Sequence, residues 1–166
     1  MAEQSIAGSD APLTSWAQVR ERIEEGIPQP RYTHWLATVR PDGRPHVMPV
    51  GVIWVDGAFC FQTGASTRKG KNLARNSHCV ITVALPGLDL VVEGEAAKVR
   101  DDAKLHRVAD VYASHGWHPT VRDGALYADY SAPSAGPPPW DVYELTPTTA
   151  FGLGTDEPYG ATRWRF

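Results

Sequence analysis

The sequence YTHWLATVRPDGRPHVMPVGVIWVDGAFCFQT, residues 32–63, decides the fold of this chain. Its first two segments, Tyr32–Arg40 and Pro45–Val55, alternate with a period of two, which is typical of half-buried β-strands. They flank the turn Pro41-Asp42-Gly43, where proline presets the first dihedral and glycine accepts a positive φ. Asp56-Gly57 is a second tight turn, into a third strand over Ala58–Thr63. The three consecutive antiparallel strands predicted here exclude a purely parallel nucleotide-binding sheet.

Two residues interrupt the second of these strands. Pro49 has no N–H for the ladder, and Gly51 has no side chain to pack against neighbours. This combination predicts either a bulge that a flat ligand approaches closely or an edge strand beside the hairpin.

The rest of the chain predicts further strands and two or three helices. Apolar residues at three- and four-residue steps predict a helix over Thr14–Glu25, capped by Thr14 or Ser15, and a second over Asp102–Ser114, capped by Asp101. Further strands are expected at His78–Leu85, Leu88–Arg100, Trp140–Thr146 and Thr148–Gly152. These elements predict a mostly β, antiparallel fold, a small closed barrel with flanking helices rather than a layered α/β fold.

One long segment, Trp117–Pro139, has no clear period. We expect it to be a loop that serves as a lid or as a dimer-contact arm. The tryptophans at its two ends, Trp117 and Trp140, are expected to pack in the core or in an interface.

Length and composition describe one soluble domain. The chain has 166 residues, of which 42% are hydrophobic and 21% charged, and this argues against disorder. We expect residues 1–13 to form a flexible N-terminal tail and residues 14–166 to form a single domain. A formal net charge of −3 supplies no global basic field for nucleic acid or a membrane surface. Without a secretory signal or an apolar span, the chain is expected in the cytoplasm.

Residues with catalytic or metal-binding chemistry form no recognisable set. Cys60 and Cys79 lie far apart on predicted strands with apolar neighbours, which argues against a disulfide, a zinc site and a reactive thiol. The six histidines show no metal-ligand spacing. Glu93 and Glu95 share one face of a strand and are expected to be solvated. No metal site and no catalytic residue are predicted.

The most informative local feature is the basic segment GASTRKGKNLARN, residues 64–76. It is typical of a glycine-opened loop that leads into a short helix, and it places four cations in an otherwise acidic chain: Arg68, Lys69, Lys71 and Arg75. Gly64 and Gly70 would let the backbone approach a ligand closely. Neutral hydrogen-bond donors are added by Ser66, Thr67 and Asn72. Such a loop suits one phosphate or a short polyanion; the alternative is an ordinary solvated helix face.

The C-terminal residues Thr162–Phe166 are too aromatic and too basic for an idle tail. As a terminal strand they would place Trp164 and Phe166 on one face and Arg163 and Arg165 on the other. The arginines would then either meet an anionic ligand or simply face water.

The order of these features resembles the pyridoxamine 5′-phosphate oxidase-like superfamily, which has a split β-barrel and binds flavins or deazaflavins at a dimer interface. The similar stretches are Trp35–Val50, Phe61–Gly64, Lys69–Asn76, Cys79–Thr82 and Val91–Ala96, and the resemblance extends over about residues 14–166. The ending Ala161–Phe166 resembles the actinobacterial flavin/deazaflavin oxidoreductases of the B group, many of which use coenzyme F-420. The longer arginine-rich ending of true vitamin B6 oxidases is missing, which argues against oxidation of pyridoxamine phosphate.

The resemblance implies a role for each part of the expected cofactor site. The cofactor phosphate would be held by Ser66, Thr67, Arg68, Lys69, Lys71 and Asn72. The ring system would be lined by Met48, Pro49 and Val50, and the junction of ring and tail would be bracketed by Thr63 and Gly64. The pocket would be closed, from the same or the partner subunit, by Arg163 and Trp164.

Three functions are consistent with this site. The first is an oxidoreductase in which coenzyme F-420 transfers hydride to a small organic acceptor. The second is an FMN-binding oxidase or flavin reductase of the same fold, and the third is a non-catalytic protein that binds a cofactor, haem or pigment. We also expect a homodimer, because a split barrel leaves the cofactor site open on one side and because apolar strand surface at Val50, Val52 and Trp54 needs cover. Neither the acceptor nor the proton donor is predicted.

Overall fold

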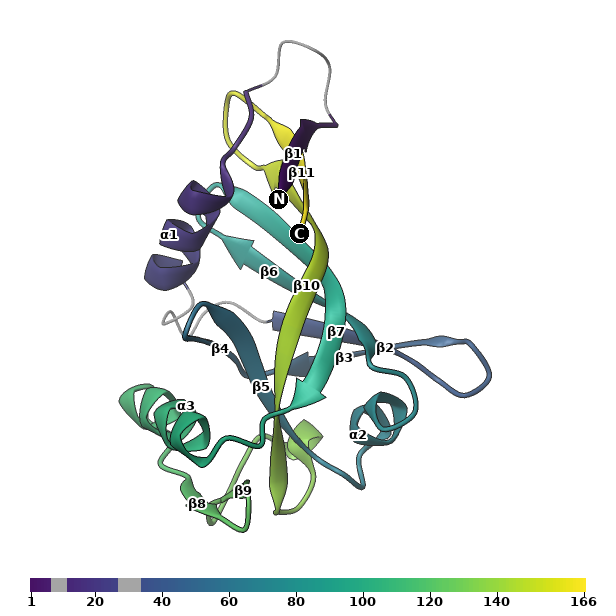
Figure 1. Ribbon diagram of the computed structural model, residues 1–166, viewed down its shortest axis with the longest axis vertical. Helices are drawn as coiled ribbons and strands as arrows, with labels where there is room; N and C mark the ends of the chain where they lie inside the picture. The colour runs from purple at the N-terminus through teal and green to yellow at the C-terminus, as the bar shows by residue number, and fades with distance from the viewer. Residues whose placement is uncertain (7–11, 27–33) are drawn as a thin grey trace.

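The computed structural model describes residues 1–6, 12–26 and 34–166, and it shows a strongly twisted antiparallel sheet with three helices at its margins (Figure 1). The helices are α1 (Trp16–Gly26), α2 (Arg68–Leu73) and α3 (Asp102–Ser114), with a 3-10 turn, η1, at Pro133–Ala135. The first strands are β1 (Ala2–Ser5), β2 (His34–Val39), β3 (Pro45–Val50), β4 (Val52–Val55) and β5 (Ala58–Gly64). The later ones are β6 (His78–Leu85), β7 (Leu88–Lys98), β8 (Thr120–Arg122), β9 (Ala125–Tyr127), β10 (Trp140–Gly154) and β11 (Ala161–Arg165). The prediction of a mostly β, antiparallel fold with flanking helices is confirmed.

The long strand β10 organises the sheet. One of its edges pairs with β7 along most of its length, while the other pairs first with β5 and later with β11. The consecutive strands β3 and β4 pair with different neighbours, β2 and β5. The sheet is therefore a split barrel that does not close, and the expectation of a closed barrel is wrong because the chain changes partners between β3 and β4.

The break between β3 and β4 lies at Gly51, inside the segment predicted as one strand. The side chain of Tyr112 on α3 reaches this point, and its hydroxyl donates a hydrogen bond of 2.8 Å to the Gly51 carbonyl oxygen. The flanking turns agree with the sequence, since β2–β3 and β4–β5 are both antiparallel hairpins. Tyr32 and Thr33, the start of the first predicted strand, lie outside the described residues.

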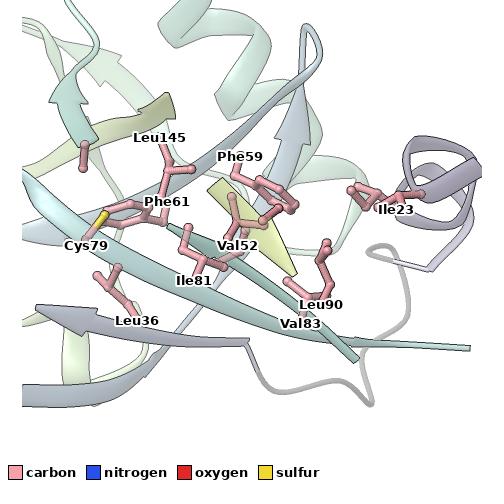
Figure 2. Close-up of a cluster of buried hydrophobic side chains, with 14 of the residues drawn as sticks. Ile23, Leu36, Val52, Phe59, Phe61, Cys79, Ile81, Val83, Leu90 and Leu145 are labelled. Atoms are coloured by element: carbon pink, nitrogen blue, oxygen red, sulfur yellow. The ribbon is translucent and has the colours of Figure 1, made fainter. Parts of the chain in front are cut away.

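Two clusters of buried apolar side chains form the core. The first lies between the sheet and α1, and Figure 2 shows Ile23 of the helix beside side chains of β5, β6 and β7. The second lies between α3 and the β4–β5–β10 layer and includes Cys60, Leu105 and Val142. Trp140 is buried in this second cluster and Trp117 packs against it, which confirms the expected packing roles of both tryptophans.

The two longer helices begin at the capping residues that the sequence offers. Before α1, Ser15 and Gln18 bond each other's backbone N–H groups, the reciprocal arrangement known as a capping box. Before α3, the Asp101 carboxylate accepts from the Lys104 N–H at 2.8 Å. No helix among the described residues is long and apolar enough to span a membrane.

Three segments differ from their predicted structure. Residues 2–5, expected within a flexible tail, form β1 because they pair with β11; residues 7–11 of that tail lie outside the described part of the chain. The expected loop 117–139 contains the hairpin β8–β9, whose turn residues Asp123 and Gly124 both have a positive φ. Strand β10 runs through Pro147 as one strand, since the ladder to β7 accommodates the proline by a shift in register.

Candidate functional site

The basic loop and α2 form a rigid structure at one end of the sheet. The Thr67 hydroxyl caps α2 by accepting from the Gly70 N–H at 3.1 Å, and it also donates to the Gly64 carbonyl oxygen at 2.8 Å. Thr63, fully buried, lies within hydrogen-bond distance of the same hydroxyl. These contacts fix the loop that leads into α2.

Two glycines make this packing possible. A Cβ on Gly70 would lie 2.5 Å from the Gly64 carbonyl oxygen, and a Cβ on Gly64 would lie 2.9 Å from the carbonyl oxygens of Ala135 and Pro137. The sequence predicted close backbone approach at both positions. In the folded chain, the group that lies close to each of these glycines is the backbone of another residue.

The segment Ser131–Pro137 forms an arm that packs on Gly64. Its residue Ser134 connects two parts of the expected site, because its carbonyl oxygen accepts from the Lys69 ammonium of α2 and its hydroxyl donates to the Pro49 carbonyl oxygen of β3 at 3.3 Å. Ser131 accepts a further hydrogen bond from Gln62 on β5 at 3.0 Å. The arm belongs to the loop 117–139, which was expected to be a lid or a dimer contact. Its hydrogen bonds instead connect β3, β5 and α2 within one chain.

Two residues expected to hold a phosphate point inward instead. Lys69 is only 2% exposed, and burial lowers the pKa of its ammonium group. Asn72 is also buried, and its side-chain amide donates to the Thr38 hydroxyl at 3.0 Å. Thr67, the third neutral donor of the expected set, is occupied as the helix cap.

The exposed cations of the segment make no carboxylate contact with the residues that the structure describes. There, lysine and arginine contacts to carboxylates are made by Arg44, Lys98, Lys104 and Arg107, but by none of Arg68, Lys71 and Arg75. Ser66 is exposed beside them. Unpaired cations next to an exposed hydroxyl are the donor set that a phosphate ester needs.

The hairpin β2–β3 brings two further polar residues to this site. Met48 and Val50 of β3 are half-buried, and His46 lies on the same face of the strand. Arg40 lies 3.3 Å from the His46 ring, measured from guanidinium Nη2 to imidazole Nδ1. Burial and the nearby charges of Arg40, Lys69 and Arg68 lower the pKa of His46. Sequence reasoning missed both residues, although the period-two spacing of His46 from Met48 was the available signal.

The residues expected to close the pocket lie at the opposite end of β10. Trp140 pairs with Gly64 and Phe151 pairs with Arg163, so eleven residues, about 35 Å of strand, separate the two ends. Figure 1 shows α2 and β11 at these two ends. Within one chain Arg163 cannot reach α2, and its guanidinium donates instead to the Gln4 side chain.

Trp164 is not available to any ligand. It is fully buried, its ring packs on Trp16 with centroids 5.4 Å apart, and its indole N–H donates to the Thr14 carbonyl oxygen at 3.1 Å. The expectation that Trp164 closes the pocket is therefore wrong, because the aromatic face of the terminal strand packs on α1. That packing agrees with the prediction that the strand places its aromatic residues on one face.

The two cysteine thiols are not activated, and no metal-ligand cluster is found among the described residues. Burial raises the pKa of the Cys60 and Cys79 thiols to about 12. The described residues contain no cluster of three or more histidine, cysteine or acidic side chains that could hold a metal ion.

An exposed apolar face lies on the outer side of the same hairpin. Trp35, Val39 and Val47 are 45%, 36% and 51% exposed, and cross-strand pairing places them on one face of β2 and β3. Beside this outer face is a cleft of about 390 Å³, lined in part by Ala37, Pro45 and Val80. Of the apolar surface predicted at Val50, Val52 and Trp54, Val52 is buried, while Val50 and Trp54 are partly buried against the first core cluster.

Comparison with known proteins identifies the same family that the residues resemble. Residues 19–154 match the family model described as pyridoxamine 5′-phosphate oxidase. A pyridoxine/pyridoxamine 5′-phosphate oxidase of Bacteroides thetaiotaomicron is 33% identical over 92 residues, which is 53% of this chain but only 43% of that protein.

Two solved structures show the same fold at low sequence identity. One is a pyridoxamine 5′-phosphate oxidase-related, FMN-binding protein of Nostoc punctiforme, with a TM-score of 0.59, 18% identity and coverage of 90% of both chains. The other is a heme-binding protein of Mycobacterium smegmatis, with a TM-score of 0.63, 19% identity and coverage of 89% of this chain and 57% of that one.

Proposed function

Because the chain belongs to the pyridoxamine 5′-phosphate oxidase family, we propose that it is an oxidoreductase that binds a phosphate-bearing flavin-type cofactor. The observation that carries this proposal is the set of cations on α2 that make no ion pair with the described residues, next to a loop whose backbone is fixed by Gly64 and the arm. Such an unpaired charge is well suited to bind an anion from outside.

The residues present fit such a cofactor in two ways. Ser66, Arg68 and Lys71 would hold the phosphate, since their side chains are exposed on the loop and on α2. The buried side-chain oxygens of Asn72 and Gln62 have no hydrogen-bond partner among the described residues, and a polyol chain could supply the missing donors. Thr63, Gly64, Thr67 and Lys69 would shape the loop from beneath rather than contact the phosphate from solvent.

The strand β3 would provide the wall for the ring system. Met48 and Val50 present half-buried apolar surface on one face of the strand, and Pro49 contributes its backbone carbonyl oxygen, which is held by Ser134. When bound, the cofactor supplies the hydride chemistry, so the protein itself needs no nucleophile or metal for that step. The chain contributes binding, orientation and partial exclusion of water.

Two cofactors are proposed, in order. Coenzyme F-420 is favoured by the number of cations that make no carboxylate contact among the described residues, because Arg68, Lys71 and Arg75 exceed what a single phosphate requires and its polyglutamate tail is a longer anion. The acceptor would be a small organic molecule. FMN is the second candidate, favoured by the family match and by the FMN-binding relative with the same fold.

We further propose a homodimer in which the apolar face of Trp35, Val39 and Val47 is buried against a second copy. Exposed apolar residues that adjoin on one sheet face are typical of an interaction surface. Isologous contact between two such hairpins would place the partner beside the open edge of β3.

The proposed function is tested by binding followed by turnover. Purified protein is titrated with F-420, FMN and haemin, and binding is followed by fluorescence or absorbance. The reduced form of any bound flavin is then mixed with a panel of organic acceptors. Binding of F-420 or FMN in the micromolar range and oxidation by an acceptor support the proposal. Binding of haemin alone would favour a pigment carrier and overturn it, and failure of all three ligands would overturn it as well.

A further inference from the structure

Two buried polar side chains connect α2 to the backbone of His46. The Asn72 amide of α2 donates to the Thr38 hydroxyl of β2, and that hydroxyl in turn lies 3.4 Å from the His46 backbone oxygen of β3. Thr38 and Asn72 are both buried. The backbone of β3 at His46 is therefore linked to α2 through buried hydrogen bonds, and the charges of Arg68 and Lys69 on α2 act on the imidazole.

The contact with Arg40 determines the protonation of the ring. An arginine guanidinium can only donate, so the Nδ1 atom of His46, 3.3 Å from the Arg40 Nη2 atom, is the acceptor. The proton of the neutral imidazole is then on Nε2. Nε2 has no hydrogen-bond partner among the described residues, which leaves one donor available to a ligand.

Among the described residues, the charges that act on His46 are all positive. Burial lowers the pKa of the ring, and so do Arg40, which directly follows β2, and Lys69 and Arg68 on α2. Asp42, the carboxylate in the hairpin turn, is engaged by the Arg44 guanidinium at 2.9 Å. Without a ligand, the ring is kept neutral beside three cations.

We propose that Arg40 and His46 complete an anion subsite with Arg68, and that a doubly charged phosphate or sulfate group bound there places a proton on His46. This inference rests on the proposed function, because the natural ligand would be the cofactor phosphate. The bound dianion offsets the three cations, so a proton from solvent can enter at Nδ1. Arg40 then leaves Nδ1 and its guanidinium becomes available to the anion. The subsite thus binds one anion and one proton together.

The test uses sulfate as the probe, since sulfate does not itself titrate near neutral pH. Sulfate is titrated into the full-length protein between pH 6 and pH 8, in two buffers of different ionisation enthalpy. Affinity is expected to fall as pH rises, by up to about tenfold per pH unit, with proton uptake on binding. His46→Gln should flatten this profile, whereas His106→Gln, which changes an exposed histidine on α3, should leave it unchanged.

A second measurement does not depend on any variant folding. The His46 imidazole signals are followed by NMR across the same pH range, with and without sulfate, and sulfate is expected to raise the pKa of His46. An unchanged titration curve, or a pH profile that His46→Gln leaves intact, would overturn the inference. If FMN binds but neither effect is seen, only this inference fails; if neither FMN, F-420 nor sulfate binds at any pH, the proposed function fails with it.

Discussion

The buried ammonium group of Lys69 donates a hydrogen bond to the carbonyl oxygen of Ser134, a residue 65 positions away on the arm. The same serine holds the Pro49 carbonyl oxygen of β3 through its hydroxyl. One residue of the arm therefore fixes both the helix that carries the cations and the strand expected to line the ring. The shape of the candidate site depends on this link.

Replacing Lys69 should affect folding more than replacing Arg68. From the sequence alone, both residues had the same expected role, as cations of the basic segment that hold a phosphate. Because Lys69 is 2% exposed, Lys69→Ala leaves a cavity and an unpaired Ser134 carbonyl, and we expect a loss of about 2 kcal/mol in the free energy of unfolding. Arg68→Ala should stay within about 0.5 kcal/mol. Urea unfolding of both variants measures the difference, and equal stabilities would refute the bracing role of Lys69.

A charge on the apolar face should dissociate the proposed dimer. Val47→Glu places a carboxylate on a side chain that is 51% exposed in the single chain, so folding should be retained. Light scattering should give twice 18.2 kDa for the parent and 18.2 kDa for this variant. Leu153→Glu, at another exposed apolar position on β10, is the control and should remain dimeric. A monomeric parent at micromolar concentration would contradict the dimer.

Arg163 can serve the site of α2 only from a partner subunit. If it does so, Arg163→Ala and Arg68→Ala each damage a different half of every shared site. In a heterodimer of the two variants, one site then combines the intact Arg68 of one subunit with the intact Arg163 of the other. Mixing the variants should therefore recover cofactor binding at one site per dimer. If the Arg163→Ala variant alone binds the cofactor as tightly as the parent, Arg163 has no role in cofactor binding, and its hydrogen bond to Gln4 is structural.

The two thiols predict how stability depends on pH. In the folded chain the pKa of each is raised by burial from 9.0 to about 12, so the folded state holds protons that the unfolded state releases. Their contribution to stability is complete below pH 9 and is lost as the pH rises from 9 toward 12. Urea unfolding should show this decline, and it should be smaller in the double variant Cys60→Ala, Cys79→Ala. Rapid labelling of native thiols at pH 8 would show that they are not buried.

Much of the fold follows from local sequence signals. The turns at Asp42-Gly43 and Asp56-Gly57 and the caps at Ser15 and Asp101 are decided within a few residues, and each agrees with the structure. The hairpin β8–β9 was missed because its strands have three residues each, too few to show a period. Its Asp123-Gly124 turn was the usable signal.

The candidate site was predictable as a segment but not residue by residue. A run of cations identifies the basic loop, but sequence does not show which of them face inward. Lys69 and Arg68 are neighbours, yet one is buried under the arm and the other exposed. That difference depends on Ser134 and Pro49, which lie far away in sequence. The position of Trp164 likewise depends on its contact with Trp16 across nearly the whole chain.

The role of the basic loop is tested most directly by comparing FMN with riboflavin, which has the same ring system without the phosphate. Dissociation constants are measured by flavin fluorescence for the parent, for Arg68→Ala and for Arg100→Ala, an exposed arginine outside the site. The parent and Arg100→Ala should bind FMN about tenfold to a hundredfold more tightly than riboflavin, as expected for a charge-assisted contact of about 1.5–3 kcal/mol. Arg68→Ala should lose most of that preference. Equal affinity of the parent for FMN and riboflavin would contradict the account, because the loop would then contribute nothing to phosphate binding.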